Sequence, residues 1–444
     1  TRCSRDWSSD VCSSDLTLTQ SGTDSYGGAT ELGVNIGRLL LLDNHTYTTT
    51  TSAQYRVVRL NTQLIYDEPE DLRRWTFGDA VATGGELGSS YNFAGINLSK
   101  LYQINPYFVK QPLAGFAGAV ALPSRVDIYM NGARVQTENV APGTFNLQNL
   151  NYRGATGLNN LEYVITDPFG REQRISSAYF YSDQLLAQGL HEYSYSAGVM
   201  RQNFGAVSND YGAAAISGFH RYGVTDRLTL GVSGDATRDH LNIGPVMTFN
   251  TVKAGVISAA ASVSHDSDVT SARGAAVSFN HNFQSGPFSS QLLVRRLTED
   301  YTVINPPTSN KPKLQGTAGV SYGTGNTGTF NLAYTYQSVY GGAIDQRATT
   351  LGYTRTIVSN VSISANVSRV VRTDASGYAA FINISYFPAN GLTAGFSHVK
   401  SAQGDVADQM QISKTTPIGE GLGYRVFAQR SVTSGTVSES IAPF

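Results

Sequence analysis

The sequence is short of charge, of cysteine and of long apolar runs. Charged residues make up 15% of its 444 residues, against roughly 25% in soluble domains. The net charge of −1 gives no electrostatic case for nucleic acid. The densest aliphatic run, Leu39–Leu42, falls far short of the ~18 residues that a membrane-spanning helix needs. Neither a nucleic-acid-binding protein nor a helical membrane protein is therefore predicted.

The two cysteines, Cys3 and Cys12, lie in the opening stretch TRCSRDWSSDVCSSDL. This stretch has no alternation, no signal-peptide core and no turn signals, and it resembles a translated sequencing adapter. We treat residues 1–16 as non-native and expect the native N-terminus to be missing. The rest of the chain has no cysteine, which is usual for barrels that cross the oxidising periplasm.

Most of the chain alternates apolar residues with small polar ones, at the period of a β-strand. Leu228, Leu230 and Val232 alternate with Thr, Gly and Ser, and residues 191–201, 328–337 and 361–368 repeat the pattern. Strands of about 9–13 residues between turn residues are typical of membrane β-barrels, because only closed sheets satisfy every backbone group in hydrocarbon. A soluble all-β protein would place more Lys and Glu on its outer face. We therefore predict an all-β fold, a large transmembrane antiparallel β-barrel.

The early strands are predicted at Thr30–Leu42, His45–Gln54, Tyr55–Tyr66, Asp71–Phe77 and Tyr91–Ser99, after a polar, turn-rich start at 17–27. Gly78-Asp79 is expected to end the fourth of these strands. The segment 101–115 contains two prolines and is expected to be irregular.

A different pattern interrupts the barrel strands at residues 117–183. Val126, Ile128 and Met130 alternate with polar residues, and Asn131-Gly132 is a strong signal for a two-residue hairpin. Further short strands are predicted at 133–137, after Pro142-Gly143, at 161–166 and at 171–180. Five short strands with tight turns indicate a small β-sandwich. Because it interrupts a run of barrel strands, we predict that it is a plug inside the barrel.

The order of several motifs resembles the fimbrial outer-membrane ushers of the chaperone–usher pathway in Gram-negative bacteria. The motifs are WTFGDAVATGGELGSSYNFAGINLSK, PLAGFAGAVALPSRVDIYMNGARV, VAPGTFNLQNL and VITDPFGREQ. The order and spacing of these motifs match that family across residues 30–235, and the sequence is similar to the ushers of Csu-type, archaic systems. Gly88–Ile96 and Leu101–Leu113 resemble the hairpin and linker that cap the plug in ushers.

The resemblance implies a gated secretion pore in the outer membrane. Its partners would be periplasmic chaperone–pilus subunit complexes, pilus subunits in the lumen and outer-membrane lipid, with no cofactor. The implied organisation is 17–116 for the first barrel strands, 117–183 for the plug and 184–444 for the remaining strands. The barrel is expected to be incomplete at the C-terminus after roughly 20 strands, and the periplasmic N- and C-terminal domains to be absent.

Polar contacts between plug and wall would let the plug be released. The candidates for plug contacts or turns are Arg125, Asp127, Asn131, Gly132, Arg134, Pro142, Gly143, Glu162, Arg171, Glu172 and Arg174. The alternative is that each is an ordinary solvated residue of a small sandwich.

No catalytic or metal site is predicted. Residues 319–323 fit G-x-S-x-G and residues 323–328 fit G-x-G-x-x-G, but neither leads into a helix. The seven histidines show no metal-ligand spacing. Two other functions stay open, a plugged small-molecule transporter or porin-like channel and an all-β adhesin. Transporters of the first kind carry the plug ahead of the barrel, whereas here several strands precede it.

Overall fold

A computed structural model describes most of the chain. The described residues are 11–12, 17–21, 25–50, 53–112, 116–120, 124–130, 133–140, 143–147, 157–166, 172–182, 184–268, 272–304, 311–324, 327–342, 345–358, 360–373, 376–388, 392–402, 404–414, 424–433 and 436–443. Across these ranges, no helix is both long and apolar enough to span a membrane.

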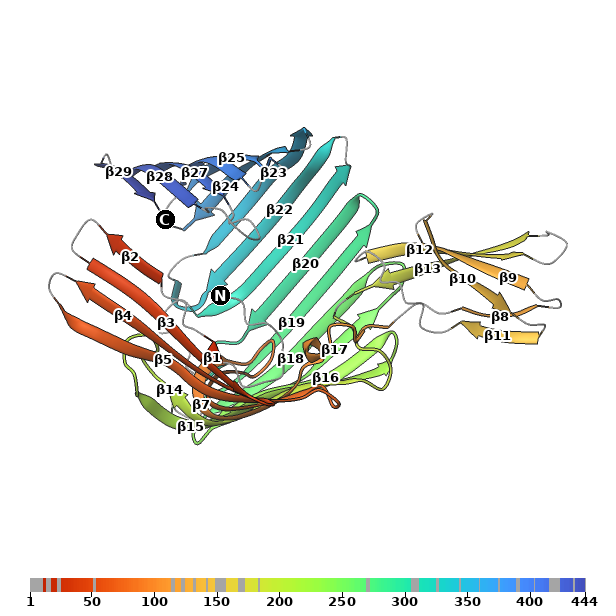
Figure 1. The fold of residues 1–444 in the computed structure, drawn as a ribbon, viewed down its shortest axis with the longest axis horizontal. Helices are drawn as coiled ribbons and strands as arrows, with labels where there is room; N and C mark the ends of the chain where they lie inside the picture. Colours follow the sequence, from red (N-terminus) through yellow and green to blue (C-terminus); the bar gives the residue numbers. More distant parts are fainter. Residues whose placement is uncertain are drawn as a thin grey trace.

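A curled antiparallel sheet forms the wall of the molecule (Figure 1). Each wall strand pairs with the next along the chain, and β7 pairs with β14 across the inserted segment. The wall strands are β2 Thr17–Ser21, β3 Ser25–Ile36, β4 Leu39–Thr50, β5 Ala53–Glu68, β6 Arg73–Thr83, β7 Ser90–Lys100, β14 His191–Arg201, β15 Tyr211–Thr225, β16 Leu228–Thr237, β17 His240–Asn250, β18 Val256–Asp266, β19 Ala272–Ser285, β20 Phe288–Leu297, β21 Pro312–Thr324, β22 Gly328–Val339, β23 Gln346–Val358, β24 Val361–Arg372, β25 Ser376–Tyr386, β26 Leu392–Lys400, β27 Val406–Lys414, β28 Tyr424–Thr433 and β29 Thr436–Pro443.

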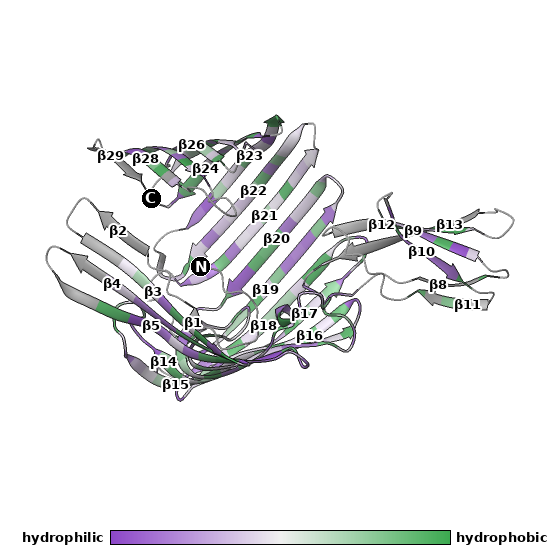
Figure 2. Cartoon of the chain, viewed as in Figure 1, coloured by the Kyte–Doolittle hydropathy of each residue, from purple (hydrophilic) through white to green (hydrophobic). Residues whose placement is uncertain are grey.

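The wall turns its apolar residues outward. On β16, Leu230 and Val232 are 42% and 47% exposed, whereas Thr229 and Ser233 on either side of this pair are buried. Figure 2 shows the same alternation of colour along the wall strands. Apolar residues outside and small polar residues inside are the pattern of a membrane barrel with a wet lumen. This confirms the predicted fold class for the wall.

The two ends of the wall differ in the length of their connections. At the end that carries the insert, the other connections span five residues or fewer except for 415–423, and Gly37-Arg38 and Gly286-Pro287 are two-residue turns. The opposite end carries the longer segments 202–210 and 298–311. Bacterial barrels have short periplasmic turns and longer extracellular loops. By this general pattern, the short-turn end is the one that would face the periplasm.

Exposed aromatic residues line the outer face near the short-turn end. They are Tyr222, Phe249, Phe288, Tyr322, Phe330 and Tyr386. Each lies within three residues of the end of its strand. Aromatic rings concentrate at membrane interfaces, where one edge is dry and the other wet. They mark the level of one membrane surface.

The inserted segment is a small sandwich of its own. Its strands are β8 Phe116–Val120, β9 Ser124–Met130, β10 Ala133–Val140, β11 Gly143–Leu147, β12 Gly157–Thr166 and β13 Glu172–Tyr181. One sheet runs β10-β9-β12-β13 and the other pairs β8 with β11. The predicted inward residues Val126, Ile128 and Met130 form its core with Leu161 and Tyr163. The sandwich is confirmed, with β8 as an additional strand.

Several early boundaries were predicted wrongly. Gly37, at φ 62°, makes the turn, so Leu39–Leu42 begin β4 instead of ending the strand before it. The stretch expected to be turn-rich contains β2 and the start of β3. β6 continues through Gly78 and Asp79, because Gly78 adopts φ 102° within the strand. Residues 11–12 of the adapter-like stretch form β1 Val11–Cys12, which pairs with β3.

Among the described residues, the edges of the wall do not pair with each other. No ladder joins β29 to β2 or β3 in this part of the chain. Figure 1 shows the last strands lying opposite the first ones across the hollow of the sheet. The irregular segment after β7 contains a short 3-10 turn, Tyr102–Ile104, which agrees with the prediction for 101–115.

Candidate transport pore

The inner face of the wall is a polar surface that holds two inward segments. Residues 84–89 connect β6 to β7, and residues 298–304 follow β20. The backbone N–H of Ser89 donates to Asp235 at 2.9 Å, and its hydroxyl donates to the carbonyl of Ile304 at 2.9 Å. The hydroxyl of Tyr301 donates to the carbonyl of Leu87 at 2.6 Å. The two segments therefore brace each other inside the wall.

A buried acid anchors this inner layer. The carboxylate of Asp235 lies 3.2 Å from Nε2 of His240, and both side chains are almost fully buried. The other ring nitrogen of His240 lies 3.3 Å from the hydroxyl of Thr302. The described residues contain no cluster of three or more His, Cys, Asp or Glu that could hold a metal ion. The arrangement suits positioning of the inner segments.

Both linkers of the insert are docked on the wall at the short-turn end. Glu192 of β14 accepts from Lys110 of the first linker at 2.5 Å and from Arg221 of β15 at 2.8 Å. The guanidinium of Arg221 also donates to the carbonyl of Gln184 in the second linker. The ion pair of Glu192 and Arg221 on the wall thus holds both linkers, the first through Glu192 and the second through Arg221.

An apolar cluster supports the same joint. Tyr102 and Leu186, one from each linker, pack with Leu72 from the turn before β6. The hydroxyl of Tyr102 donates to the carbonyl of His191 at 2.5 Å, and burial raises the pKa of Tyr102 to about 12. The linkers are therefore fixed to the wall up to this point.

Three of the predicted plug residues lie together in the sandwich. Asp127 accepts from the hydroxyl of Thr137 at 2.6 Å and from Arg125 at 3.0 Å, and Arg134 lies 3.9 Å away. The hydrogen bond from Thr137 has the largest effect on the pKa of this carboxyl. It outweighs burial and, with Arg125, holds the pKa of Asp127 below its ordinary value of 3.8. These contacts are internal to the sandwich, while Arg125 and Arg134 remain exposed.

The remaining candidates are placed only in part. Glu162 is half-buried and lies opposite Tyr129 in the β9–β12 ladder. The backbones of Gly143, Glu172 and Arg174 belong to β11 and β13. Outside the described residues are Asn131, Gly132, Pro142 and Arg171. The predicted hairpin is nevertheless present, because Met130 and Ala133 on either side of it are register partners.

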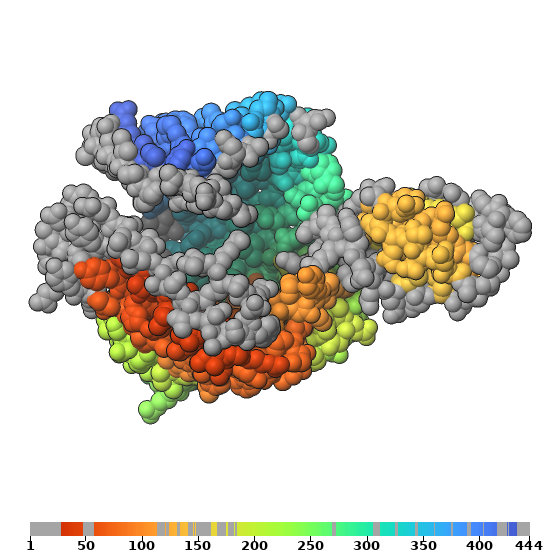
Figure 3. Space-filling view, viewed as in Figure 1, coloured from red at the N-terminus to blue at the C-terminus, as the bar shows by residue number. Residues whose placement is uncertain are grey.

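The sandwich lies beyond the end of the wall and not within it (Figure 1). Among the described residues, its strand contact with the wall pairs Leu158 of β12 with Ser285, the last residue of β19. In the space-filling view it projects to one side of the hollow wall (Figure 3). The expectation of a sandwich seated inside the barrel therefore does not describe this structure. Sequence periodicity specifies how a sandwich folds, and it carries no information on where a tethered domain sits.

The sequence analysis did not predict the inner segment 298–304 or the contacts of Glu192 with Lys110 and Arg221. Both depend on contacts between residues far apart in the chain. The resemblance to a capping hairpin was assigned to Gly88–Ile96 and so includes only the last two residues of the turn at 84–89. Its glycines, Gly84, Gly85 and Gly88, lie where an added Cβ would collide with Asp235 or Ser233. A glycine-rich turn between two long strands was the available signal.

Comparison with known proteins gives a consistent family. The model of the family described as "Outer membrane usher protein" matches residues 28–441. The outer membrane usher protein FimC of Bordetella pertussis is 23% identical over 390 residues, covering 82% of this chain and 43% of that protein. The chain spans less than half the length of the curated relatives it matches.

Solved structures show the same fold. A cryo-EM structure of the Escherichia coli P pilus tip assembly intermediate PapC-PapD-PapK-PapG in its second conformation matches with a TM-score of 0.70 and 16% identity. That match covers 98% of this chain and 56% of the other. The P pilus usher (PapC) translocation pore matches with a TM-score of 0.53 and 15% identity, covering 96% and 90%.

Proposed function

The chain belongs to the outer membrane usher family, and from this membership we propose that it forms a secretion pore for pilus subunits, gated by the sandwich at residues 116–181. The family is one of the Gram-negative outer membrane, in agreement with the outward apolar face and the aromatic belt. The role is transport and assembly, without catalysis. Membership of the Csu-type subgroup stays a prediction.

The observation that carries this proposal is the pairing of β7 with β14. Ser99 and Ser194 are register partners, although the whole insert separates them in the chain. The wall is therefore continuous without the sandwich, which is joined to its short-turn end by two linkers and touches the end of β19. A domain attached in this way can move without breaking any wall ladder. A domain whose own strands completed a wall ladder could not move in this way.

The polar inner face supports passage of folded subunits. Buried serines, threonines and asparagines line the inside of β14 to β19, among them Ser196, Ser217, Asn242, Ser262 and Ser278. A surface of small polar groups offers hydrogen bonds that water can replace, so it does not hold a passing protein as a dry apolar surface would. It also suits a sandwich that returns to the lumen through polar contacts.

The proposed partners are chaperone–subunit complexes delivered on the periplasmic side. The sandwich and both linkers lie at the short-turn end, where such complexes would arrive. In the similar P pilus assembly intermediate, the usher PapC is bound with PapD, PapK and PapG. Donor-strand exchange, a form of strand addition, would join the subunits. Arg125, Arg134 and Glu162 are proposed as the polar face that contacts the wall when the plug is seated, with the buried Asp127 positioning the two arginines.

The test is removal of the sandwich from the full-length protein. Deleting residues 117–183 should leave a folded wall with much higher conductance in a planar bilayer. A deletion that folds and conducts like the parent would overturn the gate. If conductance rises but no pilus subunit is ever exported in a complemented strain, the pore would stand and the secretion role would fall.

A further inference from the structure

The wall strands β19 to β26 carry positive charge without negative charge to balance it. No Asp or Glu occurs within the bounds of these strands. Their exposed basic residues on the outer face are Arg273, Arg296, Arg347, Arg355, Arg369 and Lys400. The earlier strands β5 and β6 contain both signs of charge. The later part of the wall therefore favours an anionic partner on its lipid-facing side.

Two of these cations, Arg347 of β23 and Arg369 of β24, are neighbours on the outer face. Thr349, two residues along β23 from Arg347, is the register partner of Arg369. The two arginines are therefore diagonal neighbours across one ladder, at a spacing of about 7–8 Å that long side chains can bridge. Both are exposed and lie within four residues of the strand ends opposite the short turns. One ligand can therefore contact both guanidinium groups at that end of the wall.

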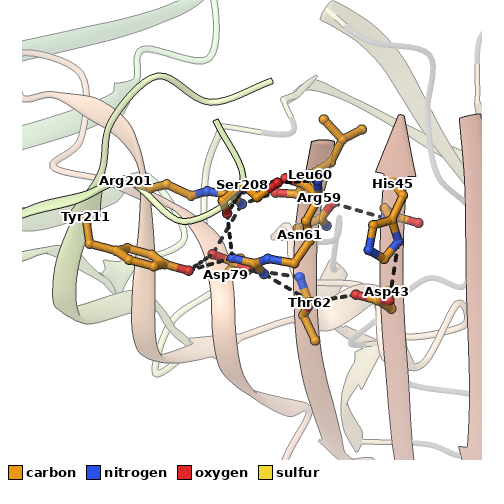
Figure 4. Close-up of polar contacts among 11 residues, drawn as sticks. Asp43, His45, Arg59, Leu60, Asn61, Thr62, Asp79, Arg201, Ser208 and Tyr211 are labelled. Carbon is orange, nitrogen blue, oxygen red and sulfur yellow. Dashed lines mark hydrogen bonds and ion pairs between the residues drawn. The ribbon is translucent and has the colours of Figure 1, made fainter. Parts of the chain in front are cut away.

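Neither of these two arginines has a hydrogen-bond or ion-pair partner in the described part of the chain. Other arginines of the wall do have partners. Figure 4 shows Arg59 paired with Asp79, and Arg201 donating to the carbonyl of Arg59 at 2.6 Å. Even the exposed Arg38, near the short-turn end, is paired with Glu70 at 2.8 Å. The pair on β23 and β24 is therefore available to an anion from outside the protein.

The surroundings of the two arginines have the composition of a lipid-binding surface. Leu351 and Val367, two residues further into the wall on the same face, are register partners and are both exposed. Tyr378 of β25 is the register partner of Arg369 and is also exposed. Cations and an aromatic ring thus lie at the level of the membrane surface, with aliphatic side chains below them. A guanidinium binds a phosphate group through two parallel hydrogen bonds.

We propose that Arg347 and Arg369 bind the phosphate of a phosphorylated glycolipid, whose acyl chains lie against Leu351 and Val367. The site lies at the end of the wall with the longer loops, which by the general pattern of bacterial barrels is the extracellular one. The outer leaflet of the Gram-negative outer membrane is built of phosphorylated glycolipid, and the ring of Tyr378 offers a flat surface to its sugar. The bound lipid stabilises the strands that it covers. The inference concerns the lipid-facing side and holds whatever passes through the lumen.

Native mass spectrometry of the full-length protein in detergent, with diphosphorylated lipid A added, measures the affinity of this site. Arg347→Gln combined with Arg369→Gln should raise the dissociation constant about twenty- to thirtyfold, a factor of roughly five for each cation at an anionic lipid surface. Lipid A stripped of its phosphates should bind the parent and the double variant equally. A difference between the two proteins that survives removal of the phosphates would overturn the assignment of the arginines to phosphate.

The matched control is Arg355→Gln. Arg355 is exposed on the same face of β23 but lies near the short turn at 359–360, at the level of the other leaflet. It should keep the parental dissociation constant. Equal constants in the double variant and in Arg355→Gln, with both proteins showing the heat-modifiable migration of a folded barrel, would overturn the proposal. Phosphatidylglycerol bound as tightly as lipid A would overturn the choice of a glycolipid. If the double variant does not fold, Arg369→Gln alone makes the same comparison with Arg355→Gln, and equal constants there would overturn it too.

Discussion

Apolar and polar residues alternate along the strands of both the wall and the insert. The apolar residues face outward in the wall and inward in the insert. Val126 and Ile128 of the insert are fully buried, whereas Val232 and Ile243 of the wall are nearly half exposed. The pattern of period two specifies that a strand has two faces, and it does not say which one meets the solvent. What separates the regions is the other face, which carries Arg and Asp in the insert and Ser, Thr and Gly in the wall.

The largest expected effect is on the core of the insert. Ile128→Ala should destabilise the sandwich by about 2–5 kcal/mol, because the side chain is fully buried among close neighbours. Hydrogen exchange of residues 124–166 in the full-length protein measures it. Val232→Ala, which removes an outward side chain, serves as the control and should leave exchange of the wall nearly unchanged. Equal effects at the two sites would contradict the opposite senses of folding.

A charged residue placed on the outer face should destabilise the folded protein more at the middle of the membrane than at its surface. Val232→Arg, near the middle of β16, should cost about 2–4 kcal/mol, and Tyr222→Arg in the aromatic belt about 0–1 kcal/mol. Urea titration of the protein folded into lipid vesicles measures both. If the two substitutions cost the same, the outer face does not have the depth profile of a bilayer.

Loosening the joint between the two regions should have a smaller effect. Glu192→Gln removes the charge that binds Lys110 and Arg221, at a cost of about 1 kcal/mol for such partly exposed pairs. Exchange at residues 102–112 and 184–190 should quicken, and bilayer recordings should show more frequent changes of conductance. Glu138→Gln, on a sandwich strand away from the joint, is the control. Recordings indistinguishable from the control would remove Glu192 from the joint.

The smallest effect is the acid response of the insert. Since the pKa of Asp127 is lowered by folding, its stabilisation is complete above its ordinary value of 3.8 and is lost as the pH falls through the lower folded value. Exchange of the sandwich, corrected for the intrinsic rate, should therefore rise below that range. Asp127→Asn should flatten the response. An unaltered response in that variant would assign the effect to other carboxyls.

Local signals identified most of the fold. The alternation at residues 228–237, the Asn131-Gly132 hairpin and the inward set Val126, Ile128 and Met130 were all read from neighbouring residues. The contacts that were missed are long-range. Arg201 reaches carbonyls more than a hundred positions away, and Gly78 lies within β6 although the sequence predicted that it ends the strand. Nothing close to Arg201 in the sequence distinguishes this buried arginine from a solvated one.

The pairing of β7 with β14 also bears on how the chain assembles. Almost every other wall ladder joins strands that follow each other directly, so it closes a short loop. This one must close a loop that contains the whole insert, and closure entropy grows with loop length. A sandwich that folds first, with Tyr102 and Leu186 brought together at its base, shortens the effective loop to its two linkers. Folding of the insert would then help the wall that carries it to assemble. Wall assembly should therefore slow when the sandwich core is weakened.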